Sequence, residues 1–294
     1  MNESAGSSLN LPAGACDCHT HVFLDPREVP FDAARHYTPP PASVEALAAL
    51  HDRLGIERVV VVQPSVYGLD HRATLHALRA LGPARARGVA VIDAATPDAA
   101  LDALADAGVT GVRVNLIFGG DDAVAQARAE LRRAAERVAP RGWHLQVFAR
   151  LPLLAACADT LQALPVPVVL DHHAGAHAGG GTRQDGLAAV LGLVEGGRAY
   201  VKLSAPYRGS DDPAYADLQP LTRLFVQANP DRLLWGSDWP HPRPGAAPRA
   251  TDVSAPYAVD VAAVLRSLQQ WVDDPAVLRK LLADNPRRLY GFDD

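Results

Sequence analysis

Residues 15–23 read ACDCHTHVF, and this stretch begins a series of short β-type runs along the chain. Its polar residues Asp17, His19 and His21 are spaced by two, so on a β-strand their side chains point to the same face. Similar runs recur along the chain, separated by alanine- and leucine-rich stretches with helical periodicity. We therefore predict strands at 15–23, 58–65, 87–93, 111–116, 144–149, 166–172, 200–205 and 233–238.

Helices are expected between these strands. The predicted ranges are 43–54, 70–82, 97–107, 121–139, 151–163, 184–195 and 213–228, with a closing helical region at 258–282. Strands alternating with helices in a chain of 294 residues predict an α/β fold, a single parallel eight-stranded (β/α)8 TIM barrel. An open doubly wound sheet is the alternative, but no G-x-G-x-x-G turn follows the first strand. The barrel domain is expected over 13–294, after a flexible N-terminal tail at 1–12.

The formal net charge is −5, and acidic and basic residues are interspersed. That distribution provides no basic face, so we expect no nucleic-acid partner. No window approaches about 18 consecutive apolar residues, which excludes a transmembrane helix and argues against a membrane partner. The N-terminus lacks the features of a signal peptide, and three cysteines form no disulfide framework. We therefore expect a cytoplasmic protein, and a homo-oligomer stays open.

Polar side chains are concentrated at the predicted C-terminal strand ends. In a (β/α)8 barrel these ends converge on one mouth, where catalytic groups lie. The residues in strand order are Asp17, His19 and His21, then Gln63 and Ser65, Arg113 and Asn115, Gln146, Asp171 with His172 and His173, Ser204 followed by Arg208, and Asp238 followed by His241. Imidazoles, carboxylates and guanidiniums from several strands predict an active site at this mouth. The proline-rich loop at 238–248 is expected to cap it.

Several of these residues also have structural interpretations. His19 and His21 could be inward barrel histidines bonded to backbone carbonyls, and Arg208 could be a surface arginine. Lys202, in the middle of the seventh strand, is as consistent with a buried ion pair as with a role in the site. Asp17 is expected to orient an imidazole.

Adjacent strand residues face opposite ways, so only one histidine of the sixth strand can enter the barrel lumen. We expect that residue to be His172 and not His173. Histidines placed in helices, loops or a strand start are expected to be non-catalytic, namely His36, His51, His71, His76 and His144.

Three motifs carry a family resemblance. They are D-C-H-T-H-V-F at 17–23, V-L-D-H at 169–172 and L-W-G-S-D-W-P-H-P at 234–242. Together they resemble the amidohydrolase superfamily (amidohydrolase-related family 2), in the branch of the 2-pyrone-4,6-dicarboxylate lactonases and sugar-lactone hydrolases. The resemblance runs from about residue 13 to 293. It implies an enzyme, a carboxylic ester hydrolase that opens a small-molecule lactone in aromatic or sugar acid catabolism.

The resemblance also implies roles for individual residues. Asp238 would be the general base on the attacking water, and His19, His21 and His172 would polarise the lactone carbonyl. Ser65, Arg113 and Arg208 match positions that contact substrate carboxylates, and Tyr37 would join them from the first βα loop. Gln146 and His241 are predicted to bind substrate from their positions on the fifth strand and after the eighth.

The sequence departs from the dicarboxylate lactonases at three pocket positions. Leu116 to Gly120 replace a stretch with a second arginine, Gly175 stands where the family has another arginine, and Gln146 stands where it has a tyrosine. These losses argue against a planar pyrone dicarboxylate. A lactone with one carboxylate, or a hydroxylated ring, fits the remaining donors.

No metal cofactor is expected. A binuclear site needs a bridging anion, and the fourth strand offers Arg113 with no lysine or carboxylate. The resemblance to lactonases that work without a metal points the same way. A single Zn²⁺ on His19, His21, His172 and Asp238 stays open, because three histidines and an aspartate are an adequate ligand set. The alternatives are a lactone isomerase of the same branch, a zinc-dependent amidohydrolase or decarboxylase, and a non-catalytic ligand-binding barrel.

Overall fold

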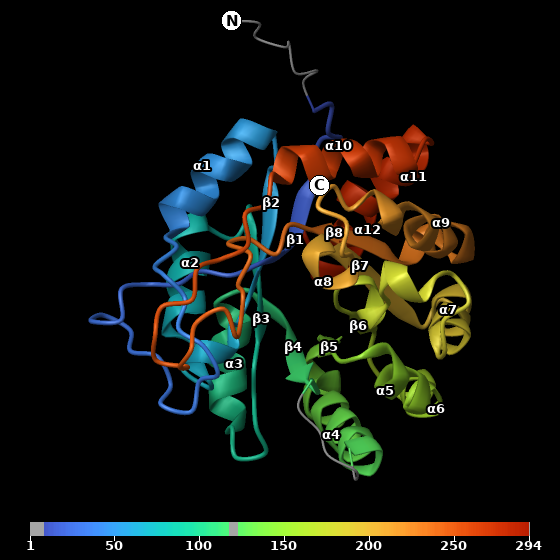
Figure 1. Cartoon of the computed structure of the whole chain (residues 1–294). Coiled ribbons are helices and arrows are strands. Elements are labelled where there is room, and N and C mark those ends of the chain that lie inside the picture. Colours follow the sequence, from blue (N-terminus) through green and yellow to red (C-terminus); the bar gives the residue numbers. More distant parts are fainter. Residues whose placement is uncertain (1–8, 118–122, 294) are drawn as a thin grey trace, which may run out of the picture.

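The computed structural model describes residues 9–117 and 123–293. Its centre is one parallel sheet in which each strand pairs with the next along the chain (Figure 1). The strands are β1 (Cys16–Thr20), β2 (Arg58–Val62), β3 (Ala86–Ala90), β4 (Val109–Asn115), β5 (His144–Phe148), β6 (Val168–Leu170), β7 (Ala199–Ser204) and β8 (Leu233–Gly236). The predicted eight-stranded (β/α)8 barrel is confirmed.

The barrel closes where β8 meets β1. The amide of Asp238 donates to the carbonyl of His19 at 2.8 Å, and the amide of His21 donates to the carbonyl of Trp239 at 2.8 Å. A Cβ on Gly236 would lie 2.6 Å from the Cβ of His19, so only glycine permits this approach. The seam therefore brings Asp238 beside the two histidines of the first strand.

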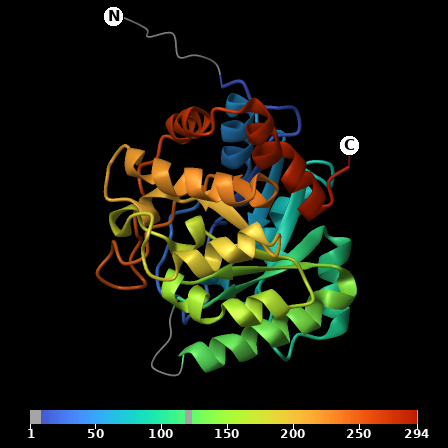
Figure 2. The ribbon, with the colours of Figure 1, turned by 90° about the vertical axis from the view of Figure 1, so that its right-hand side faces the viewer.

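Helices surround the strands on the outside (Figure 2). They are α1 (Val44–Leu54), α2 (Arg72–Leu81), α3 (Asp98–Asp106), α4 (Ala123–Val138), α5 (Leu151–Ala156), α6 (Ala158–Ala163), α7 (Leu187–Glu195), α8 (Pro206–Gly209), α9 (Gln219–Ala228), α10 (Val261–Trp271), α11 (Pro275–Arg279) and α12 (Asn285–Tyr290). The Ser43 side chain caps α1 by accepting from the amide of Ala46, and Gly55 ends it in the left-handed conformation.

Three predicted helical ranges differ from the structure by an interruption or by more than three residues at one end. The helix expected at 151–163 is divided at Cys157 into α5 and α6, and the one expected at 213–228 begins only at Gln219. The Asp212 carboxylate instead accepts from the amides of Ala214 and Ala216 and holds a turn there. The closing region 258–282 is interrupted after α10, where Asp274 and a proline at the first turn start α11.

Apolar side chains close the N-terminal end of the barrel. Strand side chains that point into the barrel form one buried cluster with the C-terminal segment, which contributes Tyr290 and Phe292. Cys16, Cys18 and Cys157 are buried and unpaired. Of the expected N-terminal tail, residues 1–8 lie outside the described residues, and the carbonyl of Asn10 accepts from Gln269 Nε2 at 3.2 Å. Among the described helices none is long and apolar enough to cross a membrane.

Candidate active site

A cavity of about 240 Å³ lies at the C-terminal ends of the strands. We call it the catalytic cavity. The predicted site residues that line it are His21, Tyr37, Ser65, Arg113, His172, Arg208 and Asp238. Pro242 and Pro244 also line it, so the proline-rich loop caps the site as expected. The structure thus brings together side chains that are more than 200 positions apart in the chain.

Asp238 lies at the base of this cavity and is almost fully buried. Its Oδ1 lies 3.2 Å from His21 Nε2 and 3.5 Å from His19 Nε2. Both Asp238 and His172 have left-handed backbones, with φ of 58° and 52°, which non-glycine residues seldom adopt. These turns directly after β8 and β6 keep the two side chains in the barrel mouth.

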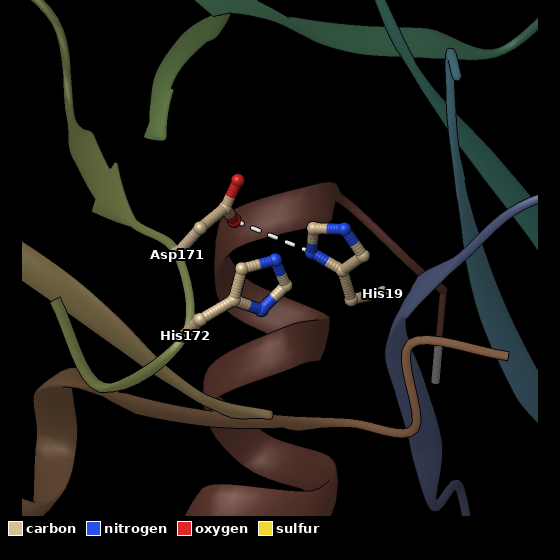
Figure 3. A group of neighbouring side chains, drawn as sticks. All are labelled: His19, Asp171 and His172. Atoms are coloured by element: carbon tan, nitrogen blue, oxygen red, sulfur yellow. Dashed lines mark ion pairs between the residues drawn. The ribbon is translucent and has the colours of Figure 1, made fainter. Parts of the chain in front are cut away.

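A second buried carboxylate, Asp171, supports His19 from below. Its Oδ1 lies 3.2 Å from His19 Nδ1, and its Oδ2 accepts from Arg113 Nε at 2.9 Å and from Gln146 Nε2 at 3.0 Å. Figure 3 shows this pair with the His172 ring beside it, and the two imidazole centroids are 4.7 Å apart. Lys202 completes the network by donating to Gln146 Oε1 at 2.6 Å.

Serine and tyrosine side chains hold the remaining groups. His172 Nδ1 lies 2.8 Å from Ser204 Oγ. Tyr207 donates its hydroxyl to Asp238 Oδ2 at 2.5 Å, and Arg208 Nε lies 3.6 Å from the same oxygen. Tyr257, from the loop after β8, stacks on Tyr207 with ring centroids 4.2 Å apart. The two oxygens of Asp238 therefore have different surroundings: Oδ1 faces histidines, and Oδ2 is held by a phenol and a guanidinium.

The hydrogen bond of His21 fixes its neutral tautomer. Its Nδ1 lies 2.8 Å from the carbonyl oxygen of Val62, which can only accept, so Nδ1 carries the proton. The lone pair on Nε2 then faces Asp238. A lone pair opposite a carboxylate is unfavourable until a proton or a cation lies between them. In this tautomer, neutral His21 cannot donate a hydrogen bond from Nε2. That atom can instead accept a proton or bind a cation.

Burial and charge set the ionisation of the site. Burial lowers the pKa of His19 to about 4 and the pKa of Lys202 to about 8. Burial opposes ionisation of Asp238, but the neighbouring histidines, His172 above all, together with Arg208 outweigh it and hold the pKa of that carboxyl well below its ordinary value. For Asp171, burial is likewise outweighed, chiefly by Arg113, so its pKa is also low. At neutral pH both carboxylates are ionised and His19 is neutral.

The donor atoms fit one metal ion. His19, His21 and Asp238 place their ligand atoms within 4.8 Å of one another, as do His19, Asp171 and His172. Within the described residues, His19 Nε2 and Asp238 Oδ1 have no hydrogen-bond partner, so both atoms are available as metal ligands. A second ion would lack a bridging anion, because β4 contributes the guanidinium of Arg113. The residues present therefore suit a mononuclear site.

Three predicted site residues do not line the catalytic cavity. His19 is fully buried and does not line it, and the side-chain amide of Gln146 is hydrogen-bonded to Asp171 and Lys202. His241 is buried but lines a different cavity, beside α1 and α10. Gln146 therefore influences the site by its hydrogen bond to Asp171, and it does not line the catalytic cavity.

Other residues have unexpected positions. His36, expected to be non-catalytic, lines the catalytic cavity. Asp17 does orient an imidazole, but that imidazole belongs to His51 of α1, at 3.2 Å. His173 does not line the catalytic cavity, as expected, but lines another cavity; the left-handed backbone after β6, and not strand alternation, separates it from His172.

Tyr207 is the functional candidate that the sequence analysis missed. The only available signal was its position next to Arg208, in the segment after the seventh strand. A tyrosine there carries no distinctive motif, and its contact with Asp238 depends on the fold. Asp171 and Ser204 were noted at strand ends, but their partners could not be identified from spacing.

The chain is similar to known proteins over nearly its whole length. It is 37% identical to the 2-pyrone-4,6-dicarboxylate hydrolase of Comamonas testosteroni, across 96% of this chain and 92% of that protein. It is 30% identical to the 4-sulfomuconolactone hydrolase of Rhizobium radiobacter, across 98% and 93%. A solved structure from Agrobacterium tumefaciens superposes with a TM-score of 0.80 at 27% identity, across 96% and 97%. The amidohydrolase family model matches residues 16–292. The chain belongs to the amidohydrolase family.

Proposed function

We propose that this protein hydrolyses the internal ester of a small carboxylated or hydroxylated lactone, with Asp238 as general base. The observation that carries the proposal is Asp238 itself, an ionised carboxylate at the base of a cavity that also contains Arg113 and Arg208. Such a cavity suits an anionic ring whose ester needs an activated water. The names of the two relatives, a 2-pyrone-4,6-dicarboxylate hydrolase and a 4-sulfomuconolactone hydrolase, support the same reaction class.

The substrate would bind in the catalytic cavity, held by the side chains that line it. Arg113 uses Nε for Asp171, which leaves the other guanidinium nitrogens available for a substrate carboxylate. Its guanidinium lies 4.7 Å above the Phe148 ring, which holds it flat. Tyr37 and Ser65, which also line the cavity, add neutral hydroxyl donors. A cavity of about 240 Å³ suits a single ring with one carboxylate or several hydroxyls.

The proposed reaction begins with a water beside Asp238 Oδ1. Water oxygen attacks the lactone carbonyl carbon while Asp238 accepts a proton, and the ring C–O bond then breaks as its oxygen takes up a proton. The product is a ring-opened hydroxy acid. Ser204 can donate to His172 Nδ1, which places a proton on His172 Nε2 to stabilise the carbonyl oxygen as its charge grows. His21 Nε2, at 3.2 Å, can take the proton from Asp238 and pass it on.

We further propose that this reaction needs no resident metal. Arg113, Arg208 and Lys202 stand against two carboxylates, Asp171 and Asp238, so the site already has a surplus of one positive charge. A divalent cation would add to that surplus. A zinc ion, if bound, would be held by His19, His21, His172 and Asp238 and would supply Lewis-acid polarisation.

Metal analysis tests this part. Enzyme treated with a chelator should keep its lactonase activity with well under one equivalent of metal per chain. Activity that disappears with the metal and returns with added zinc would contradict metal independence. The proposal that the protein hydrolyses a lactone would still stand after that result.

A screen of lactones tests the reaction itself. Sugar-acid lactones, muconolactones and pyrone carboxylates are mixed with the enzyme, and acid release is followed with a pH indicator. Mass spectrometry of the product should show the substrate plus one water. An unchanged mass with a changed structure would instead identify a lactone isomerase, and loss of CO2 a decarboxylase. Cytoplasmic location and homo-oligomerisation stay predictions.

Replacing Tyr207 by Phe should shift the pH dependence. The phenol donates to Asp238 Oδ2 and stabilises the charged carboxylate, so its removal raises the pKa of Asp238. The acid limb of kcat/KM should therefore move to higher pH by about one to two units, since a hydrogen bond to a charged group contributes about 1.5–3 kcal/mol. Tyr215→Phe, which removes a phenol with no contact to Asp238 among the described interactions, should leave the profile unchanged. Identical profiles for both variants would refute a role for Tyr207.

A further inference from the structure

A second cavity, of about 370 Å³, lies between the barrel and its outer helices. We call it the outer cavity. Leu203 and Trp235 form its wall on the barrel side, and Thr222 of α9 with Val264 and Trp271 of α10 form the other. None of the residues that line it lines the catalytic cavity. Its volume lies in the range of small-molecule sites.

Two polar side chains in this wall have no partner. Trp235 is 2% exposed and Thr222 is 0% exposed, yet Trp235 Nε1 and Thr222 Oγ1 have no hydrogen-bond partner within the described residues. A buried indole N–H almost always finds an acceptor in folded proteins. An unsatisfied donor beside an apolar cavity therefore points to a ligand that brings the acceptor.

The charge of the wall indicates the class of that ligand. Among the described residues that line the outer cavity there is no lysine or arginine. The one acidic group is Asp260, whose carboxylate already accepts from the amide of Ala263 at 3.0 Å. The other polar residues of the lining are serine, threonine, tyrosine and tryptophan side chains and His173. The catalytic cavity, with Arg113 and Arg208, attracts anions, whereas the outer cavity offers an anion no countercharge.

We propose that the outer cavity is a second binding site, for a neutral aromatic molecule that carries one hydrogen-bond acceptor. The acceptor would lie at Trp235 Nε1, and the ring would pack among Leu203, Val264 and Trp271. The site borders the segment that builds the active site, because Ser204, the partner of His172, and Pro206, the first residue of α8, also line it. A ligand here would contact the active-site scaffold without entering the catalytic cavity.

Acetophenone and benzoate form a matched pair of probes, equal in size and different in charge. Acetophenone should raise the unfolding temperature of the full chain in a dose-dependent way, and crystals soaked in it should show the ketone oxygen at Trp235 Nε1. Benzoate should not occupy the outer cavity. Ordered waters alone between Trp235 and Thr222, or acetophenone found only in the catalytic cavity, would overturn the proposal.

Variants locate the binding in solution. Ala263→Leu fills the outer cavity and should abolish the acetophenone-induced shift, whereas Ala262→Leu, one residue along the same helix and lining a different cavity, should preserve it. Trp235→Phe keeps a ring and removes the donor, so the affinity should fall about fivefold. Unchanged affinity in folded Ala263→Leu protein would refute the site. Because binding is measured directly, failure of lactone hydrolysis would leave this result unaffected.

Discussion

Replacing Asp238 by Asn should lower kcat by about 10²-fold or more. The amide has the same shape but cannot accept a proton from water, and general-base catalysis contributes on the order of 10²–10⁴-fold. KM should change little, because Asp238 faces the histidines and the substrate carboxylate is expected at Arg113. Steady-state kinetics on the lactone identified by the screen measure both constants.

Two controls define this result. Asp211→Asn removes a carboxylate whose side chain is 95% exposed and should leave kcat unchanged. Thermal unfolding of Asp238→Asn should show that the barrel is intact. Wild-type kcat in a folded Asp238→Asn enzyme would rule out Asp238 as the base. If the wild type catalyses no reaction and Asp238→Asn binds the ligand as tightly as the wild type does, the protein would be a non-catalytic binding barrel.

Replacing Arg113 by Met should affect both binding and stability. The Arg113 side chain is 7% exposed and its Nε lies 2.9 Å from Asp171. Its loss leaves the buried carboxylate with His19, Gln146 and Lys202 as its remaining neighbours. Breaking a buried ion pair costs about 3–5 kcal/mol, and the remaining partners favour the lower end. The KM for a carboxylated lactone should rise about tenfold or more, because a charged hydrogen bond contributes about 1.5–3 kcal/mol. Urea unfolding and steady-state kinetics check the two effects separately.

Arg113→Lys is the informative comparison. It keeps a positive charge near Asp171 but lacks the planar fork that serves Asp171 and a ligand at once, so stability should recover more than KM does. Arg79→Met, on the exposed face of α2, should change neither quantity. Loss of stability with an unchanged KM would show that Arg113 supports Asp171 and does not touch the substrate.

The barrel and the place of its active site could be predicted from the sequence. The alternation of β-type and helical runs reflects which face of each regular element is buried. Strand side chains alternate between two faces, so the two-residue spacing of His19 and His21 predicted that they share a face. His172 lines the catalytic cavity and His173 does not, as expected, but both follow β6 in left-handed backbone, so strand alternation is not the physical reason. The C-terminal ends of parallel strands must meet at one mouth, so polar residues at those ends predicted the cavity without any contact being known.

Only the tertiary structure shows which side chains from different strands and loops are hydrogen-bond partners. The sequence does not state that Tyr207 donates to Asp238, that Val62 fixes the tautomer of His21, or that Gln146 serves Asp171. Each contact depends on strand register, on the seam between β8 and β1, and on left-handed turns after strands, none of which has a local pattern. Periodicity reports which face a residue occupies. Hydrogen-bond partners depend on distances of a few tenths of an ångström, which only the packed chain determines.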